Sequence, residues 1–146
     1  MKNYFGDNLY YTTTAFSREI SAIAENGFAD LGLTPSDAYL IMCVNEKPNI
    51  QPTEISEKIL LAPSTITRMI EKLEKRDIVT RATEGKYTFV APTAKGKDIY
   101  VLVIKQWDEI GKIFSQKLGD STVSSLIQFT TQAAAVLTVP PKKKGK

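Results

Sequence analysis

Two short amphipathic segments joined by a tight connection constrain the fold of this chain more than any other feature. Apolar residues recur every three or four positions in residues 52–60 and again in residues 64–76, a spacing that predicts two helices. The apolar positions are Ile55, Ile59, Ile66, Ile70 and Leu73. Only residues 61–63, Leu-Ala-Pro, separate the two segments, and the second carries more cationic side chains. This arrangement predicts a helix-turn-helix at about residues 52–76.

A β-hairpin is expected directly after the second helix. Residues 78–83 and 86–91 are both rich in β-branched and aromatic side chains, and Glu84 and Gly85 stand between them as a turn pair. A hairpin after a helix-turn-helix is the order of a winged helix, with the wing at about residues 78–91. The expected fold class is therefore mainly α with a small β-hairpin wing (α+β).

Long helices are expected on both sides of the winged helix-turn-helix. Apolar stripes predict them at about residues 4–30, 94–118 and 120–138. We expect these helices and the winged helix to form one domain, residues 1–139. Residues 140–146, Pro-Pro-Lys-Lys-Lys-Gly-Lys, form a basic tail that cannot pack.

Capping residues mark the expected helix starts. Thr34, followed by Pro35 and Asp37, indicates the start of a mostly apolar, buried helix that continues to about residue 45. Thr93 is expected to cap the helix that begins at residue 94. Asp120 or Ser121 is expected to cap the last helix.

Composition excludes several classes of function. The chain has no His and one Cys, so it cannot build a His-dependent nucleophile system, a Cys-rich zinc site or an intramolecular disulfide. Cys43 lies among apolar residues and is expected to be a buried, inert thiol. No secretory signal pattern is visible, and the longest apolar run, near residues 38–44, is far too short for a bilayer span. We therefore expect a cytoplasmic protein that is not an enzyme, with no metal, cofactor or membrane partner.

Charge is distributed unevenly along the chain. Residues 1–50 carry a net charge of −3, residues 51–97 a net charge of +3, and residues 98–146 again +3. The C-terminal half would therefore hold an anionic partner, although a total of +3 is modest.

The order of elements and three short motifs resemble the MarR (multiple antibiotic resistance regulator) family of winged helix-turn-helix transcription factors. The motifs are LTP at residues 33–35, STITRMIEKLEKRDIV at residues 64–79, and PTAKGK at residues 92–97. The last resembles the opening of the family's dimerisation helix, with Pro92 where Leu is usual. The resemblance covers about residues 5–137. The wing loop departs from the family pattern, because it is shortened to residues 83–86.

The resemblance implies binding to double-stranded DNA. A helix fits the major groove, and the residues at its N-terminus meet base edges and backbone. Arg68 can pair with guanine through two hydrogen bonds, whereas Lys72, one turn further on, is expected to contact the DNA backbone. Short hydroxyl side chains can reach phosphates or bases. The expected DNA-binding residues are Thr53, Ser64, Thr65, Thr67, Arg68, Lys72, Arg81 and Lys86.

Each of these residues also has a plain structural interpretation. Ser64 could simply cap a helix, and Arg68 and Lys72 could belong to a solvated face with acidic neighbours. Arg81 could be an ordinary exposed strand residue, and Lys86 a charge that protects a sheet edge. The winged-helix context favours DNA contact for Arg68.

The flanking helices carry more apolar surface than a winged helix of this size needs, which predicts burial against another chain. The resemblance implies a two-fold homodimer that reads a pseudo-palindromic operator, with half-site centres about 10 bp apart. It also implies release of DNA by a small aromatic or phenolic ligand. Candidate residues for its cleft are Phe5, Tyr10, Tyr11, Phe16 and Met42, each of which could equally be a packing residue.

The sequence therefore predicts a dimeric, sequence-specific DNA-binding transcriptional regulator, more often a repressor than an activator in such families. The alternative is a winged helix used as a protein-interaction or dimerisation module, in which the second helix of the motif does not meet DNA. The short wing and modest basicity support that alternative. The salt dependence of binding separates the two, because release of counterions from DNA makes affinity fall steeply with salt.

Overall fold

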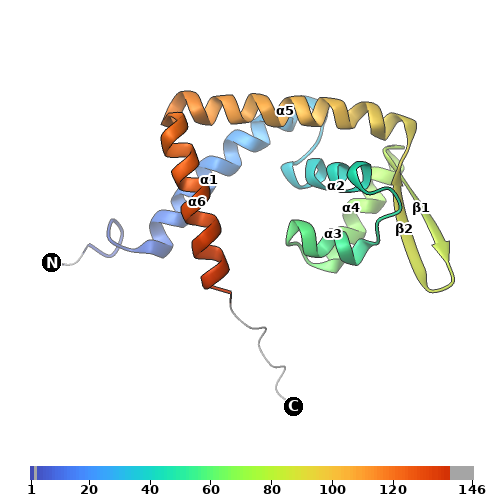
Figure 1. The fold of residues 1–146 in the computed structure, drawn as a ribbon, viewed down its shortest axis with the longest axis horizontal. Coiled ribbons are helices and arrows are strands. Elements are labelled where there is room, and N and C mark those ends of the chain that lie inside the picture. The colour runs from blue at the N-terminus through green and yellow to red at the C-terminus, as the bar shows by residue number, and fades with distance from the viewer. Residues whose placement is uncertain (2, 139–146) are drawn as a thin grey trace, which may run out of the picture. The chain divides into compact units, whose positions relative to one another are not determined.

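The structure is a computed structural model that describes residues 1 and 3–138, and within these residues the chain is helical apart from one two-stranded hairpin (Figure 1). The elements in order are α1 (Leu9–Phe28), the 3-10 helix η1 (Ala29–Leu31), α2 (Pro35–Glu46), α3 (Pro52–Ile59), α4 (Pro63–Lys75), β1 (Val79–Glu84), β2 (Tyr87–Pro92), α5 (Ala94–Leu118) and α6 (Asp120–Val136). The expected fold class, mainly α with a β-hairpin wing, is confirmed.

The chain packs as two compact units. The first runs from Met1 to Ile110, and the second begins at Gly111, inside α5. The second unit therefore contains the end of α5 and the whole of α6, which buries none of its residues. The single domain expected over residues 1–139 stays a prediction, and the basic tail expected at 140–146 lies outside the described residues.

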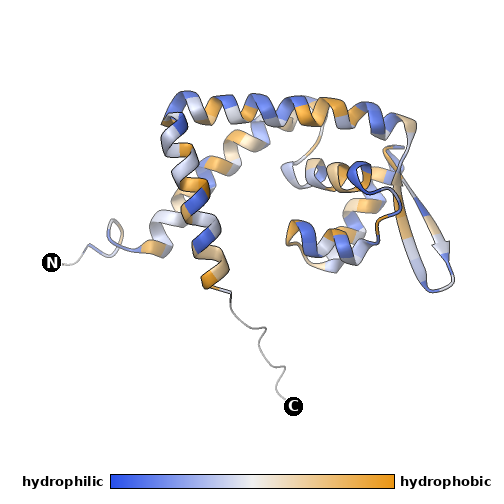
Figure 2. Cartoon of the chain, in the orientation of Figure 1, coloured by the Kyte–Doolittle hydropathy of each residue, from blue (hydrophilic) through white to orange (hydrophobic). Residues whose placement is uncertain are grey.

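The core of the first unit contains the apolar stripe that predicted the helix-turn-helix. Its large, fully buried side chains come from α1, α2, α3, α4, the segment around the hairpin and α5, and the apolar residues of these elements are shown in Figure 2. They include Phe28, Leu40, Ile41, Ile55, Ile66, Ile70, Leu73, Ile78 and Val90. The opposite side of α4 is exposed, so the helix is held by one face only.

The hairpin differs from its expected position by one residue. Its antiparallel register pairs Val79 with Pro92 and Glu84 with Tyr87, so the turn is made by Gly85 and Lys86 rather than by Glu84 and Gly85. Gly85 adopts a φ of 59°, which a glycine accepts at little cost and which lets the two strands close. A single bridge to Ile50 joins the other side of β2.

Local capping rules predict the start of α2 and of α5. In α2, the Thr34 hydroxyl accepts from the Asp37 amide, and the Asp37 carboxylate accepts from the Thr34 amide, which together form a capping box. In α5, the Gly96 amide donates to the Thr93 hydroxyl over 2.9 Å, so the expected cap is confirmed. Gly96 also passes so close to the Ile78 carbonyl that a Cβ would collide with that backbone oxygen.

Two helix starts were predicted incorrectly. The first helix begins at Leu9 rather than near residue 4, because the Asn8 side chain accepts from the Tyr11 amide and forms the cap. The last helix is preceded by Gly119 as its N-cap, so neither Asp120 nor Ser121 has that role.

Cys43 is buried, with 2 % of its surface exposed, as expected, and burial raises the pKa of its thiol. In the described part of the chain, none of the helices combines the length and apolar character that a bilayer crossing needs.

Candidate nucleic-acid interface

The N-terminal half of α4 is presented at the surface by a proline start and a buried opposite face. Pro63 occupies the first helical position, where its missing N–H would have no intrahelical partner in any case. Ile66, Met69 and Ile70 are buried, whereas Ser64, Thr67 and Arg68 are exposed. This pattern places short hydroxyl groups and a guanidinium together on the exposed side of the first two turns.

The side chains in the N-terminal half of α4 differ in the hydrogen bonds that they make within the chain. Ala62 is the N-cap of α4, so the interpretation of Ser64 as the cap is wrong. The Thr67 hydroxyl donates to the Pro63 carbonyl over 3.1 Å, which leaves its oxygen able to accept. Within residues 1 and 3–138, the Arg68 guanidinium has no hydrogen bond or ion pair. Arg68 is therefore available for an external acceptor.

Lys72 has a partner inside the protein. Its Nζ lies 2.6 Å from Oδ2 of Asp37, a carboxylate with 1 % of its surface exposed, while the Lys72 side chain is 47 % exposed. The residue that was expected to meet the DNA backbone therefore forms an ion pair with α2.

Arg81 is also held by a partner, and it comes from α4. Its Nη2 and Nε donate to Oε2 of Glu74 over 2.6 and 3.0 Å. This hydrogen bonding lowers the pKa of the Glu74 carboxyl and raises the pKa of the Arg81 guanidinium. The pair fastens β1 to α4. The interpretation of Arg81 as an ordinary exposed strand residue therefore misses this contact.

Two further expected residues lie at the surface around α4. Lys86 belongs to the turn of the wing, with its Nζ 5.4 Å from the centre of the Tyr87 ring. Thr53 is exposed in the first turn of α3, and Thr65 is half-buried in the first turn of α4. Some of the expected DNA-binding residues are thus exposed, whereas Lys72 and Arg81 connect elements of the fold.

Two contacts between α4 and residues 31–37 were not predicted from the sequence: the ion pair of Lys72 with Asp37 and the hydrogen bonds of Arg76. The Arg76 guanidinium donates to the carbonyl oxygens of Gly32 over 2.6 Å and Leu31 over 3.1 Å. Its position four residues after Lys72 was the available signal, because residues at that spacing lie on the same side of a helix.

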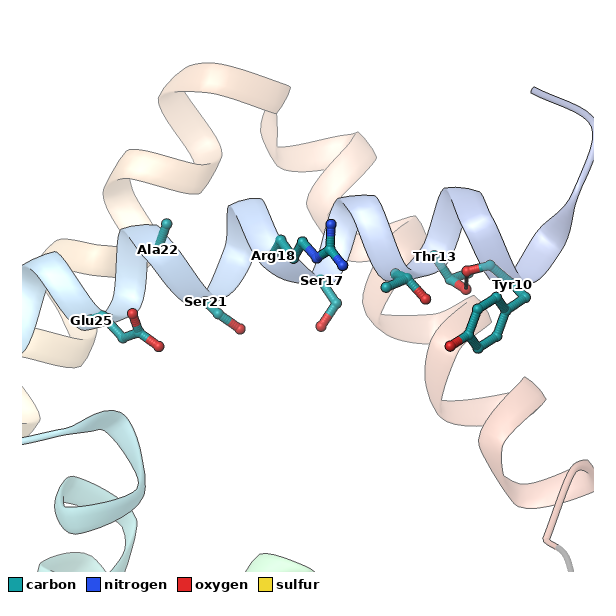
Figure 3. Close-up of a pocket in the computed structure, with 8 residues that line it drawn as sticks. Tyr10, Thr13, Ser17, Arg18, Ser21, Ala22 and Glu25 are labelled. Atoms are coloured by element: carbon teal, nitrogen blue, oxygen red, sulfur yellow. Dashed lines mark hydrogen bonds between the residues drawn. The ribbon is translucent and has the colours of Figure 1, made fainter. Parts of the chain in front are cut away.

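The five residues expected to line a ligand cleft do not share one cavity. Tyr10 lines an open groove of about 690 Å³ along α1, together with Thr13, Ser17 and other α1 residues (Figure 3). Met42 instead lines a cavity of about 380 Å³ between α2 and α3. The other residues of that cavity are Tyr39, Cys43, Glu46, Lys58, Ile59 and Leu60.

Phe5, Tyr11 and Phe16 are exposed, and Tyr11 meets Phe5 edge to face with ring centres 5.2 Å apart. Of the five expected residues, Met42 alone lines the cavity between α2 and α3, and the expected ligand cleft stays a prediction. No cluster of three or more metal-binding side chains occurs in the part of the chain that the structure describes.

Comparison with known proteins agrees with this arrangement. Residues 33–84, from the start of α2 into β1, match the sequence model of the MarR family. The transcriptional regulator SarZ of Staphylococcus aureus strain MRSA252 is 27 % identical over 84 residues, which are 58 % of this chain and 57 % of that protein. The match thus spans less than two thirds of that relative.

Solved structures share the fold over almost their whole length. A structure described as the transcriptional repressor CouR bound to a 23-mer DNA duplex has a TM-score of 0.83. It is 17 % identical and covers 92 % of this chain and 98 % of its own. CouR from Rhodococcus jostii RHA1 bound to p-coumaroyl-CoA has a TM-score of 0.78 at 16 % identity, covering 96 % of this chain and 100 % of its own. The fold of this chain is that of winged helix-turn-helix regulators.

Proposed function

We propose that this chain, which belongs to the MarR family, is a dimeric transcriptional regulator that binds specific DNA sequences. The observation that carries the proposal is the exposed N-terminal half of α4, where Ser64, Thr67 and Arg68 lie opposite a fully buried apolar face. A helix presented in this way can enter the major groove without uncovering the core.

Arg68 is the residue we assign to base reading. Its guanidinium is exposed and can donate two parallel hydrogen bonds to O6 and N7 of guanine, a pairing worth about 1–3 kcal/mol of discrimination. Thr65 and Thr67 lie in the same turns. The Thr65 hydroxyl can donate to a base edge or a phosphate, and the Thr67 oxygen can accept from a donor on a base edge.

Phosphate contacts would fix the register of the helix on the duplex. Ser64 in the first turn of α4 suits a phosphate, as does Thr53 at the start of α3. Lys86, in the exposed turn of the wing, is placed to meet the backbone or the minor groove. These contacts carry no sequence information themselves but hold Arg68 against the bases.

The proposed homodimer is supported by apolar surface that each unit leaves uncovered. In the first unit, Leu9, Tyr10 and Phe16 of α1 are exposed. In the second unit, Ile127, Phe129 and Val136 of α6 are exposed. Such faces are normally buried against another chain. Two copies related by a two-fold axis would read a pseudo-palindrome with half-site centres about 10 bp apart. A monomer in light scattering at micromolar concentration would contradict this part of the proposal.

Repression relieved by a small aromatic or phenolic ligand completes the proposal. The cavity lined by Met42, Tyr39 and Leu60 has a volume of about 380 Å³ and lies between α2 and α3, the helix that precedes the reading helix. A ligand there would release DNA only if it prefers a geometry that does not fit the groove. Because DNA is the proposed partner, the proposed location is the cytoplasm.

Benzoate and phenol are suitable probes for the ligand. Added to a preformed protein–DNA complex, either should lower the fraction of DNA bound. A Met42→Trp variant, whose indole would fill the cavity, should keep its DNA under the same conditions. Release of DNA from the variant as readily as from the unaltered protein would exclude this cavity.

A fluorescence-anisotropy titration tests the function as a whole. The probe is the intergenic DNA that flanks the gene of this protein, compared with scrambled DNA at two salt concentrations. Tight binding that prefers the native segment and weakens steeply with salt is expected. Equal, weak binding to both DNAs would favour the alternative, a protein-interaction module, whose apolar contacts respond little to salt.

A further inference from the structure

The C-terminal half of α4 is attached to the start of α2 by an ion pair that spans 35 residues of sequence. Lys72 Nζ donates to Asp37 Oδ2 over 2.6 Å. Because α4 contains both Lys72 and the proposed base-reading Arg68, any constraint on Lys72 also constrains the direction in which Arg68 points.

Asp37 depends on Lys72 for compensation of its charge. Its carboxylate is buried, and Oδ2 also accepts from the Thr34 amide over 2.9 Å. Among the described residues, Oδ1 has no hydrogen-bond partner. A buried carboxylate with so few donors is strongly destabilised when its cation is removed. Lys72 is therefore held at Asp37 by a larger free energy than an exposed surface pair provides.

Arg76 makes a second attachment to the same segment. It lies one turn after Lys72, and its two terminal nitrogens donate to the carbonyl oxygens of Leu31 and Gly32. These carbonyls end η1, directly before α2, so they would otherwise lack helical partners. Residues 31–37 thus receive two cationic side chains from one side of α4.

We propose that Lys72 and Arg76 are positioning residues for DNA recognition, and that Lys72 does not contact a phosphate. They set the rotation and tilt of α4 against residues 31–37, and so direct its exposed N-terminal half toward the groove. The inference rests on the proposed DNA-binding function. It adds that the N-terminal half of α4 contacts DNA while Lys72 and Arg76 in the C-terminal half fix the position of the helix. Since η1 follows α1 without a break, the same attachments join the end of α1 to the reading helix.

The test is the DNA affinity of four variants as a function of salt, with the full chain and a duplex that contains its binding site. Lys72→Met removes the cation, Asp37→Asn removes the buried charge, and a double variant removes both. Lys75→Met is the matched control, because Lys75 is an exposed cation on the same helix with no partner among the described residues.

Positioning predicts that both single variants weaken binding about tenfold, with the slope of log affinity against log salt unchanged. Asp37 is buried and cannot touch DNA, so its effect has to pass through α4. The double variant should lose no more affinity than the single variant that binds DNA less tightly, because the two groups act as a pair. Lys75→Met should retain the affinity of the unaltered protein within about threefold.

A phosphate contact predicts a different pattern. Lys72→Met and the double variant would both reduce the salt slope by about one, and Asp37→Asn would bind DNA as the unaltered protein does. That result would overturn the inference. If Lys72→Met does not fold, as judged by circular dichroism, Lys72→Gln replaces it. Glutamine can still donate to Asp37, and an unchanged salt slope remains the expected result.

The salt dependence of the unaltered protein distinguishes failure of the proposed function from failure of this inference. Unaltered protein that shows no salt-dependent DNA binding would overturn the proposed function, and the role of Lys72 in recognition with it. A steep salt dependence in the unaltered protein, with a shallower slope only in the Lys72 variants, would overturn this inference alone.

Discussion

The two halves of α4 contain the same kinds of residue but have different roles. Arg68, Lys72 and Arg76 recur every fourth position, so they lie along one side of the helix. Arg68 has no partner within residues 1 and 3–138, whereas Lys72 binds Asp37 and Arg76 binds two carbonyl oxygens. The difference comes from what lies opposite each half, since residues 31–37 face only the second. Neighbouring segments, and not residue type, decide which cation is available to an external acceptor.

A substitution in the buried face of α4 should lower the free energy of unfolding more than one in its exposed half. Leu73 is fully buried, and Leu73→Ala should lower the free energy of unfolding by about 2–5 kcal/mol through loss of burial and the cavity left behind. Urea denaturation followed by circular dichroism measures the change. Thr67→Ala, in the exposed half, is the control and should stay within about 0.5 kcal/mol. Equal losses at the two positions would show that the halves are not distinguished by packing.

Loss of the Arg76 hydrogen bonds should lower the free energy of unfolding by a smaller amount than Leu73→Ala. Arg76→Met removes two charge-assisted hydrogen bonds and leaves the Leu31 and Gly32 carbonyls without those donors, which should cost about 1–3 kcal/mol of unfolding free energy. The measurement is again the urea midpoint, with Lys75→Met as the control. If both variants unfold at the midpoint of the unaltered protein, Arg76 does not hold residues 31–37.

A smaller effect is expected at the wing. Lys86 is exposed in the hairpin turn, so Lys86→Ala should reduce the salt slope of DNA binding by about one and weaken all sequences alike. Anisotropy titrations of specific and scrambled DNA at several salt concentrations would measure both quantities. A change in sequence preference with an unchanged slope would mean that the wing reads bases instead of phosphates.

The smallest effect concerns the pair between α4 and β1. Arg81 lowers the pKa of Glu74 in the folded chain, so the contribution of this pair to stability is present above the ordinary pKa of a glutamate. It is lost as the pH falls through the lowered pKa, because the protonated carboxyl no longer pairs. The difference in Tm between the unaltered protein and Arg81→Ala should therefore shrink as the pH is lowered from 7 to 3. A difference that stays constant would show that packing of the Arg81 side chain, and not its charge, stabilises the wing.

The helices and the wing could be predicted because they obey local rules. The stripe of Ile66, Ile70 and Leu73 predicted the buried face of α4, and Thr34 with Asp37 predicted the start of α2. Each of these signals lies within a few residues. The hairpin was misplaced by one residue because Glu84–Gly85 and Gly85–Lys86 both contain the glycine that the turn needs.

The candidate site could be predicted only in part. Arg68 and Ser64 were expected at the surface and lie there. The partners of Lys72, Arg76 and Arg81 depend on which segments the fold brings together, and Asp37 and Lys72 are 35 residues apart. The sequence pattern of a cationic residue in a helix is the same whether its side chain faces solvent or a buried carboxylate. Tyr10 and Met42 line different cavities for the same reason.

The specificity of an Arg68→Ala variant would show whether the exposed first half of α4 reads DNA sequence. Anisotropy titrations would compare the affinity for the specific duplex with that for scrambled DNA, in the unaltered protein and in the variant. If α4 reads the sequence, the ratio of the two affinities should fall by about 5- to 150-fold, equivalent to the loss of one guanine contact, while the urea midpoint stays unchanged. A variant that keeps the full ratio would contradict the assignment of α4 as the reading helix.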